Sequence, residues 1–162
     1  MAIASLGRIE EDGLETRLCA FSRWQVSKHT SMEGLRVLVV EDELMVWLEL
    51  QDNLRELGCD IAGSAAHVAE ARALAQTVDF DVAVLDLNLC GERTDDIADL
   101  LAARGIPFIF ATGYGQEGVA QRHRNVPIIE KPYTTELLRM ALVQLAASLG
   151  ARGEARLPDT LR

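Results

Sequence analysis

The sequence predicts an α/β domain in which five parallel strands form a doubly wound sheet, in the order 2-1-3-4-5, with helices on both faces. The main observation is that short apolar runs alternate five times with segments of helical periodicity between residues 34 and 149. This alternation is typical of strand–helix–strand units. Hydrophobic residues make up 49% of the chain and aromatic residues only 5%, so the core is expected to be aliphatic.

The expected strands are short apolar runs of the kind that is buried on both faces of a sheet. They cover residues 35–40, 60–65, 82–85, 107–111 and 126–129. The expected helices repeat apolar residues every three or four positions. They cover residues 44–57, 67–77, 94–104, 116–124 and 134–149. Gly58 is expected to end the first helix, and Gly150 follows the last.

The folded domain is expected to span residues 34–149. Residues 1–33 form a polar extension that is expected to be poorly ordered or to contain a short helix. Four apolar residues near helical spacing favour the helix: Leu14, Leu18, Phe21 and Trp24. An over-long gene start, with Met32 as the true initiator, is the alternative. Residues 150–162 are expected to form a disordered tail.

Composition excludes several classes of protein. Asp and Glu outnumber Lys and Arg by 25 to 16, so the basic stripe that nucleic-acid binding requires is missing. Cys19, Cys59 and Cys90 lack the spacing of a zinc site or a disulfide framework. No apolar run approaches the roughly 20 residues of a membrane span. The sequence therefore predicts a soluble, cytoplasmic protein with no nucleic-acid or membrane partner.

Polar residues stand at the carboxyl ends of four expected strands. Glu41 and Asp42 follow the first strand, Asp86 the third, Thr112 the fourth and Lys131 the fifth. In a sheet of this order these strands are neighbours, and their carboxyl ends line one crevice. We therefore expect two or three carboxylates, a hydroxyl and an ammonium group to share one pocket.

This set of groups suits a divalent cation and a phosphoryl group. Crowded carboxylates repel one another unless a cation lies among them, and oxygen ligands favour Mg²⁺. Lys131 and the Thr112 hydroxyl would receive phosphoryl oxygens, and Asp86 could act as the nucleophile. The sequence thus predicts Mg²⁺-dependent phosphoryl transfer to Asp86.

The chain resembles the receiver domain of two-component response regulators from about residue 34 to residue 149. The resemblance rests on four motifs at consecutive strand ends, which are VLVVEDE, AVLDLNL, FATGY and EKPY. It implies a flavodoxin-like fold and a Mg²⁺ site. The implied metal ligands are Glu41, Asp42, Asp86 and the backbone carbonyl of Asn88.

The resemblance also implies a role for each remaining site residue. Asp86 is the expected phospho-acceptor and Thr112 the expected switch hydroxyl. Lys131 is expected to pair with the phosphoryl group and to precede a cis Lys131–Pro132 bond.

One position departs from the family pattern. Most receivers carry Tyr or Phe three residues before the lysine, as an aromatic switch, and this chain has Ile128 there. Its FATGYG string places Tyr114 two residues after Thr112, which resembles the FATGUY subclass of stand-alone receivers. Tyr114 is therefore a candidate switch residue carried on the Gly113–Gly118 loop, and a plain loop aromatic is the alternative.

The implied function is to accept a phosphoryl group from a sensor histidine kinase or a histidine phosphotransferase. The protein would then signal to a downstream protein through direct contacts, with a homodimer left open. No enzymatic activity is expected beyond its own phosphorylation and dephosphorylation.

Three alternatives compete with this interpretation. One is an interaction module that is never phosphorylated. Another is a Mg²⁺-dependent phosphatase, although that family expects a second aspartate where this chain has Asn88. Gly113, Gly115 and Gly118 also spell a dinucleotide-binding motif, but they follow the fourth strand rather than the first.

Overall fold

The main sheet has five parallel strands, seen here in a computed structural model that describes residues 32–113 and 115–153. The strands are β1 (Arg36–Val40), β2 (Asp60–Ala65), β3 (Val82–Leu85), β6 (Phe108–Thr112) and β7 (Ile128–Glu130). They pair in the order β2-β1-β3-β6-β7. The predicted fold class and strand order are therefore confirmed.

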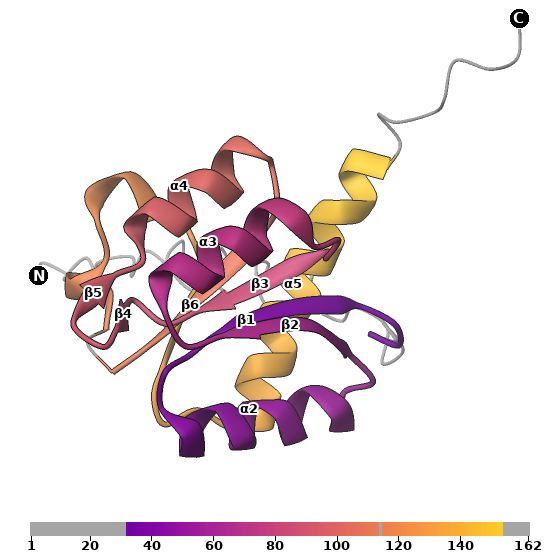
Figure 1. Ribbon diagram of the computed structural model, residues 1–162. Helices are drawn as coiled ribbons and strands as arrows, with labels where there is room; N and C mark the ends of the chain where they lie inside the picture. The colour runs from indigo at the N-terminus through magenta and orange to yellow at the C-terminus, as the bar shows by residue number, and fades with distance from the viewer. Residues whose placement is uncertain (1–31, 114, 154–162) are drawn as a thin grey trace, which may run out of the picture. The chain divides into compact units, whose positions relative to one another are not determined.

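Helices cover both faces of this sheet (Figure 1). Helices α2 (Leu44–Glu56) and α5 (Thr135–Gly153) pack on one face, and α3 (Val68–Thr77) and α4 (Asp95–Ala103) pack on the other. Successive strand residues point to opposite faces. Val39 of β1 accordingly belongs to the core under α2 and α5, and Val40 belongs to the core under α3 and α4.

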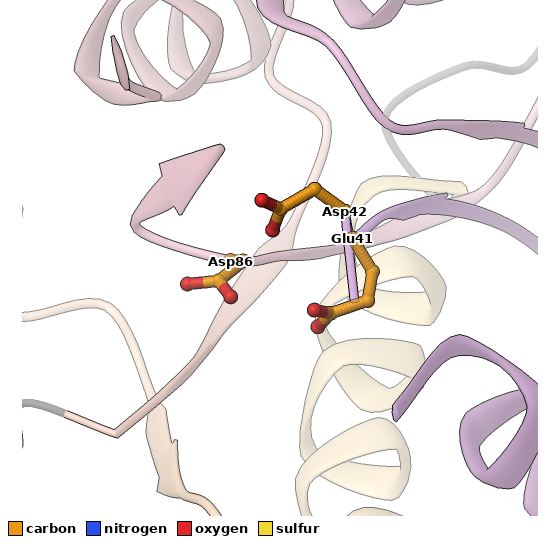
Figure 2. A group of neighbouring side chains, drawn as sticks. All are labelled: Glu41, Asp42 and Asp86. Atoms are coloured by element: carbon orange, nitrogen blue, oxygen red, sulfur yellow. The ribbon is translucent and has the colours of Figure 1, made fainter. Parts of the chain in front are cut away.

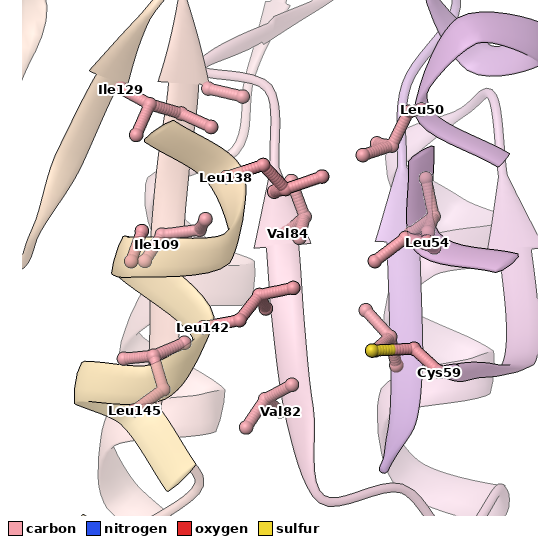
Figure 3. Packing of buried hydrophobic residues seen from close by; sticks show 14 of the residues in the cluster. Leu50, Leu54, Cys59, Val82, Val84, Ile109, Ile129, Leu138, Leu142 and Leu145 are labelled. Carbon is pink, nitrogen blue, oxygen red and sulfur yellow. The ribbon is translucent and has the colours of Figure 1, made fainter. Parts of the chain in front are cut away.

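The core under α2 and α5 is built from aliphatic side chains, as predicted (Figure 3). Leu138 and Leu142 of α5 face Val82 and Val84 of β3, and all four are fully buried or nearly so. Burying each such side chain stabilises the fold by about 2 kcal/mol. This packing fixes the strands relative to one another, and with them the residues at their carboxyl ends.

Both ends of the domain extend beyond the predicted boundaries. Met32 is buried in the core under α2 and α5, so packing begins two residues earlier than predicted. Gly150 does not end the last helix, because α5 continues to Gly153; one glycine costs a helix only about 1 kcal/mol. Residues 1–31 and 154–162 lie outside the described residues, and the predictions for them stay predictions.

The segment predicted as a helix over residues 116–124 is not α-helical. It forms two 3₁₀ helices, η1 (Gln116–Gly118) and η2 (Gln121–His123). Val119 and His123 are buried, and the His123 ring packs edge-on against Phe108 and Phe110. The burial of His123 depends on partners that are distant in sequence, so the local pattern of the sequence does not predict it.

A short hairpin follows β3 that the sequence did not predict. It consists of β4 (Asn88–Leu89) and β5 (Glu92–Arg93), paired antiparallel. Its turn places Cys90 at φ 52° and Gly91 at φ 89°, a left-handed geometry suited to a two-residue hairpin loop. Among the helices of residues 32–113 and 115–153, none is long and apolar enough to cross a membrane.

Candidate functional site

Three carboxylates converge beyond the carboxyl ends of β1 and β3 (Figure 2). Glu41 and Asp42 directly follow β1, and Asp86 directly follows β3. One oxygen from each carboxylate lies within 4.8 Å of the others. Glu41 and Asp86 are buried, whereas Asp42 is partly exposed. The structure therefore brings together three residues that the sequence placed in one pocket.

Lys131 is the cation that faces this cluster. Its Nζ donates hydrogen bonds to Glu41 Oε2 and to Asp86 Oδ2, each at 2.6 Å. The lysine follows β7, and the peptide bond to Pro132 is cis. Both the position of Lys131 and this bond agree with the expectation from the resemblance.

Burial and charge act in opposite directions on these groups. Burial raises the pKa of Glu41, and its hydrogen bond to Lys131 only partly offsets this. Burial alone would lower the pKa of Lys131, but the bonds that Asp86 and Glu41 accept outweigh it and raise that pKa. Lys131 is thus a fixed positive charge between two buried carboxylates.

Backbone amides of the hairpin contact two of the three carboxylates, Asp86 and Asp42. Asp86 Oδ1 accepts a hydrogen bond from Asn88 N at 3.2 Å, and Asp42 Oδ2 accepts one from Cys90 N at 2.8 Å. Partial burial alone would raise the pKa of Asp42, but the hydrogen bonds from Cys90 outweigh it and hold that pKa below its ordinary value. Asp42 is therefore ionised at neutral pH.

An open cavity of about 730 Å³ gives access to the cluster. The site residues on its wall are Asp42, Asp86, Asn88 and Lys131. Glu43, which directly precedes α2, and Val46 and Glu49 of α2 form another part of the wall. A ligand can therefore approach Asp86 beside the start of α2.

Thr112 is fully buried at the end of β6, and the next residue, Gly113, lines the cavity. The Thr112 carbonyl accepts a hydrogen bond from Lys131 N at 3.0 Å. The structure thus places Thr112 beside the Lys131 segment. Tyr114 lies outside the described residues, so its role as a switch residue stays a prediction.

Two residues of the site were missed by sequence reasoning. Thr94 is fully buried, and its Oγ1 donates to the backbone carbonyl of Asp86 at 2.6 Å instead of capping α4. Tyr133 lines the cavity, and its buried hydroxyl has no hydrogen-bond partner among the described residues. A threonine before a helix resembles an ordinary N-cap, so the sequence held no signal for the Thr94 contact.

The donor set fits Mg²⁺. An octahedral Mg²⁺ with Mg–O distances of about 2.1 Å holds its ligand oxygens about 3–4 Å apart. Oxygens of Glu41, Asp42 and Asp86 already lie within 4.8 Å of one another, and all are hard ligands of the kind that Mg²⁺ prefers. The Asn88 carbonyl as a further ligand stays a prediction.

Known proteins resemble this chain over the same region. It is 38% identical to SdrG from Sphingomonas melonis Fr1, covering 70% of this chain and 97% of that one, with a TM-score of 0.64. It is 30% identical to the receiver domain of the response regulator PhyR from Erythrobacter litoralis, covering 72% and 92%, with a TM-score of 0.63.

A longer relative matches in part. The transcriptional regulatory protein PdtaR of Mycobacterium tuberculosis is 31% identical over 117 residues, which are 70% of this chain and 57% of PdtaR. The chain thus spans little more than half the length of this relative. The family model of the response regulator receiver domain matches residues 37–143. With its sheet order and acidic cluster, this chain belongs to the response regulator receiver domain family.

Proposed function

We propose that Asp86 accepts a phosphoryl group from a phosphohistidine of a partner protein, in a reaction that requires Mg²⁺. The observation that supports this most is the position of the Asp86 carboxylate. It lies 2.6 Å from the Lys131 ammonium, beside Glu41 and Asp42, on the wall of an open cavity.

In the proposed reaction a carboxylate oxygen of Asp86 attacks the phosphorus atom. The new P–O bond forms as the P–N bond of the phosphohistidine breaks, and the imidazole leaves with the electron pair of that bond. Mg²⁺ held by Glu41, Asp42, Asp86 and the Asn88 carbonyl would supply charge neutralisation.

Lys131 would exchange a carboxylate oxygen for a phosphoryl oxygen, so its positive charge stays paired throughout. The Thr112 hydroxyl would donate to another phosphoryl oxygen and act as the switch. Tyr114, two residues further, is proposed to change its exposure as the loop moves.

The route of approach favours a protein donor. Leu44 and Met45 on the first turn of α2 are 67% and 75% exposed, and they flank the cavity wall formed by Glu43, Val46 and Glu49. Exposed apolar side chains beside a reactive group are typical of a docking surface. A sensor histidine kinase or histidine phosphotransferase is the proposed donor, and a downstream protein is the proposed recipient of the signal.

The test is intact mass spectrometry after incubation with Mg²⁺ and an acyl phosphate. The wild type is expected to gain the mass of one phosphoryl group, and Asp86→Asn is expected to gain none. Asp52→Asn, which alters an exposed carboxylate on α2, serves as the matched control and is expected to behave as the wild type.

Other outcomes would favour a rival function. An adduct that survives Asp86→Asn would place the phosphoryl group elsewhere. An unmodified wild type would favour a module that binds partners without phosphorylation. Continuous release of inorganic phosphate with many turnovers would favour the phosphatase.

A further inference from the structure

The hairpin after β3 contacts the acidic site and also contacts segments outside that site. Arg93, its last residue, donates from Nη2 to the carbonyl of Gly118 at 2.9 Å. The same guanidinium donates from Nε to Asp95 Oδ2 at 2.5 Å. Arg93 therefore joins the end of η1 to the first residue of α4.

The first strand and the turn of the hairpin are held by the acidic site; Asn88 of that strand pairs with Arg93. Asn88 N and Cys90 N donate to the carboxylates of Asp86 and Asp42. Asn88 Oδ1 accepts a hydrogen bond from Gly91 N at 2.8 Å, which closes the turn. A ligand that reorients either carboxylate must therefore change the hydrogen bonds that position this hairpin.

Arg93 contacts the segment of residues 115–124, and this segment is anchored to α4 near its C-terminal end. Arg122 makes two hydrogen bonds to Asp99 of α4, at 2.8 and 2.9 Å, and His123 Nε2 makes another at 2.8 Å. The segment begins at Gly115, which has a φ of 60°. Between these two points, Arg93 donates its side-chain hydrogen bond to the carbonyl of Gly118.

We propose that Arg93 is a positioning residue that couples occupancy of the acidic site to the conformation of residues 115–124. The coupling runs from Asp42 and Asp86 through the backbone of the hairpin to the Gly118 carbonyl. By linkage, if a ligand at the acidic site changes the affinity of a partner for residues 115–124 by some factor, that partner changes the affinity for the ligand by the same factor. The inference rests on the proposed function, because it requires a ligand at these carboxylates.

The chemistry of arginine is required for this role. A planar guanidinium can hold a carboxylate and a carbonyl at the same time in fixed directions, whereas a lysine ammonium is a point charge. Arg93→Gln removes the ion pair with Asp95 and shortens the side chain. Arg93→Lys keeps the positive charge but lacks the planar guanidinium that donates in two fixed directions. Both variants leave Glu41, Asp42, Asp86 and Lys131 in place.

Arg72→Gln is the matched control. Arg72 Nη2 pairs at 3.0 Å with Asp96, the neighbour of Asp95 on the first turn of α4. Its side chain is 46% exposed and that of Arg93 is 51% exposed. The Arg72 pair joins α3 to α4 and does not involve the hairpin or residues 115–124.

The experiment measures hydrogen exchange of the full chain, without ligand, with Mg²⁺ alone, and with Mg²⁺ plus an acyl phosphate, with intact mass recorded in parallel. In the wild type, phosphorylation is expected to change exchange of residues 115–124 on the order of fivefold, the low end of measured couplings. Arg93→Gln and Arg93→Lys are expected to acquire the phosphoryl group but lose this change. Arg72→Gln is expected to retain it.

The outcomes separate this inference from the proposed function. If Arg93→Gln is phosphorylated and shows the wild-type change, the coupling does not run through Arg93. If the wild type is phosphorylated and residues 115–124 do not respond, the coupling is absent. If no phosphoryl group is acquired and Mg²⁺ alters no amide, the proposed function fails and the coupling fails with it. Unchanged exchange of β3 and β6 in the unliganded variants verifies their fold.

Discussion

Tyr133 places a phenol where the acidic site meets the core under α2 and α5. Its side chain is 8% exposed and belongs to that core. Burial raises the pKa of Tyr133, as do the negative charges of Glu41, Glu49 and Asp86, so the hydroxyl keeps its proton. A buried donor without an acceptor costs about 1–3 kcal/mol. The ring therefore stabilises this region, and the hydroxyl does not.

Tyr133→Phe is accordingly expected to leave the free energy of unfolding unchanged or to raise it by about 1 kcal/mol. Tyr133→Ala, which also removes the ring, is expected to lower it by about 3–5 kcal/mol. Urea denaturation of both variants provides the measurement. A loss of more than 1 kcal/mol in the phenylalanine variant would mean that the hydroxyl has an acceptor in solution.

At the scale of elements, η2 lies in the segment that the sequence predicted to be an α-helix, and charged side chains hold it against α4. Asp99, near the middle of α4, accepts hydrogen bonds from both Arg122 and His123. The Arg122 guanidinium holds the pKa of Asp99 below its ordinary value of 3.8. The stabilisation that this carboxylate provides is therefore present above pH 3.8 and is lost as pH falls through the lowered pKa.

Asp99→Asn is expected to lower the melting temperature by roughly 1–4 °C at pH 7, because the ion pair with Arg122 is exposed to solvent. The difference from the wild type should shrink as pH falls below 3.8, where Asp99 itself takes up a proton. Thermal unfolding followed between pH 7 and pH 3 measures this. Asp96→Asn is the control, because Asp96 pairs with Arg72 instead of η2; an equal effect in both variants would contradict the anchoring of η2.

At the scale of the whole molecule, the acidic site joins segments from three strands of one sheet. Glu41 and Asp42 follow β1, Asp86 follows β3, and Lys131 follows β7. Three carboxylates face one ammonium group there, so negative charge remains in excess. A cation that relieves this repulsion stabilises the entire domain, because unfolding separates its ligands.

Millimolar Mg²⁺ is thus expected to raise the melting temperature by a few degrees, as about 1 kcal/mol of binding energy does in a domain of this size. Because burial raises the pKa of Glu41, the effect should begin to fade at a pH above 4.5, as Glu41 takes up a proton. Calorimetry with and without Mg²⁺ tests this. Asp42→Asn is expected to lose most of the shift, and an unchanged wild-type midpoint in metal-free protein would contradict the site.

The sequence predicted those parts of the molecule that depend on local pattern. Apolar runs located the strands, and the residues that follow them, such as Asp86 and Lys131, marked the site, because parallel strands end at the same edge. The Arg93–Gly118 contact and the Thr94–Asp86 contact depend on which loops meet in three dimensions. The end of α5 was misplaced because the helix continues through Gly150, and one glycine lowers helix propensity by only about 1 kcal/mol.

The two outer strands of the sheet have a further consequence for association. β7 has three residues and lies between Pro127 and Pro132, which lack the amide hydrogens that an added strand would use. β2, at the opposite edge, carries an irregularity in its register with β1, between Val37 and Leu38. Short, proline-flanked or irregular edges resist pairing with another chain. Both edges of the sheet therefore disfavour the addition of a strand from another chain, which is the step by which sheets grow into larger aggregates.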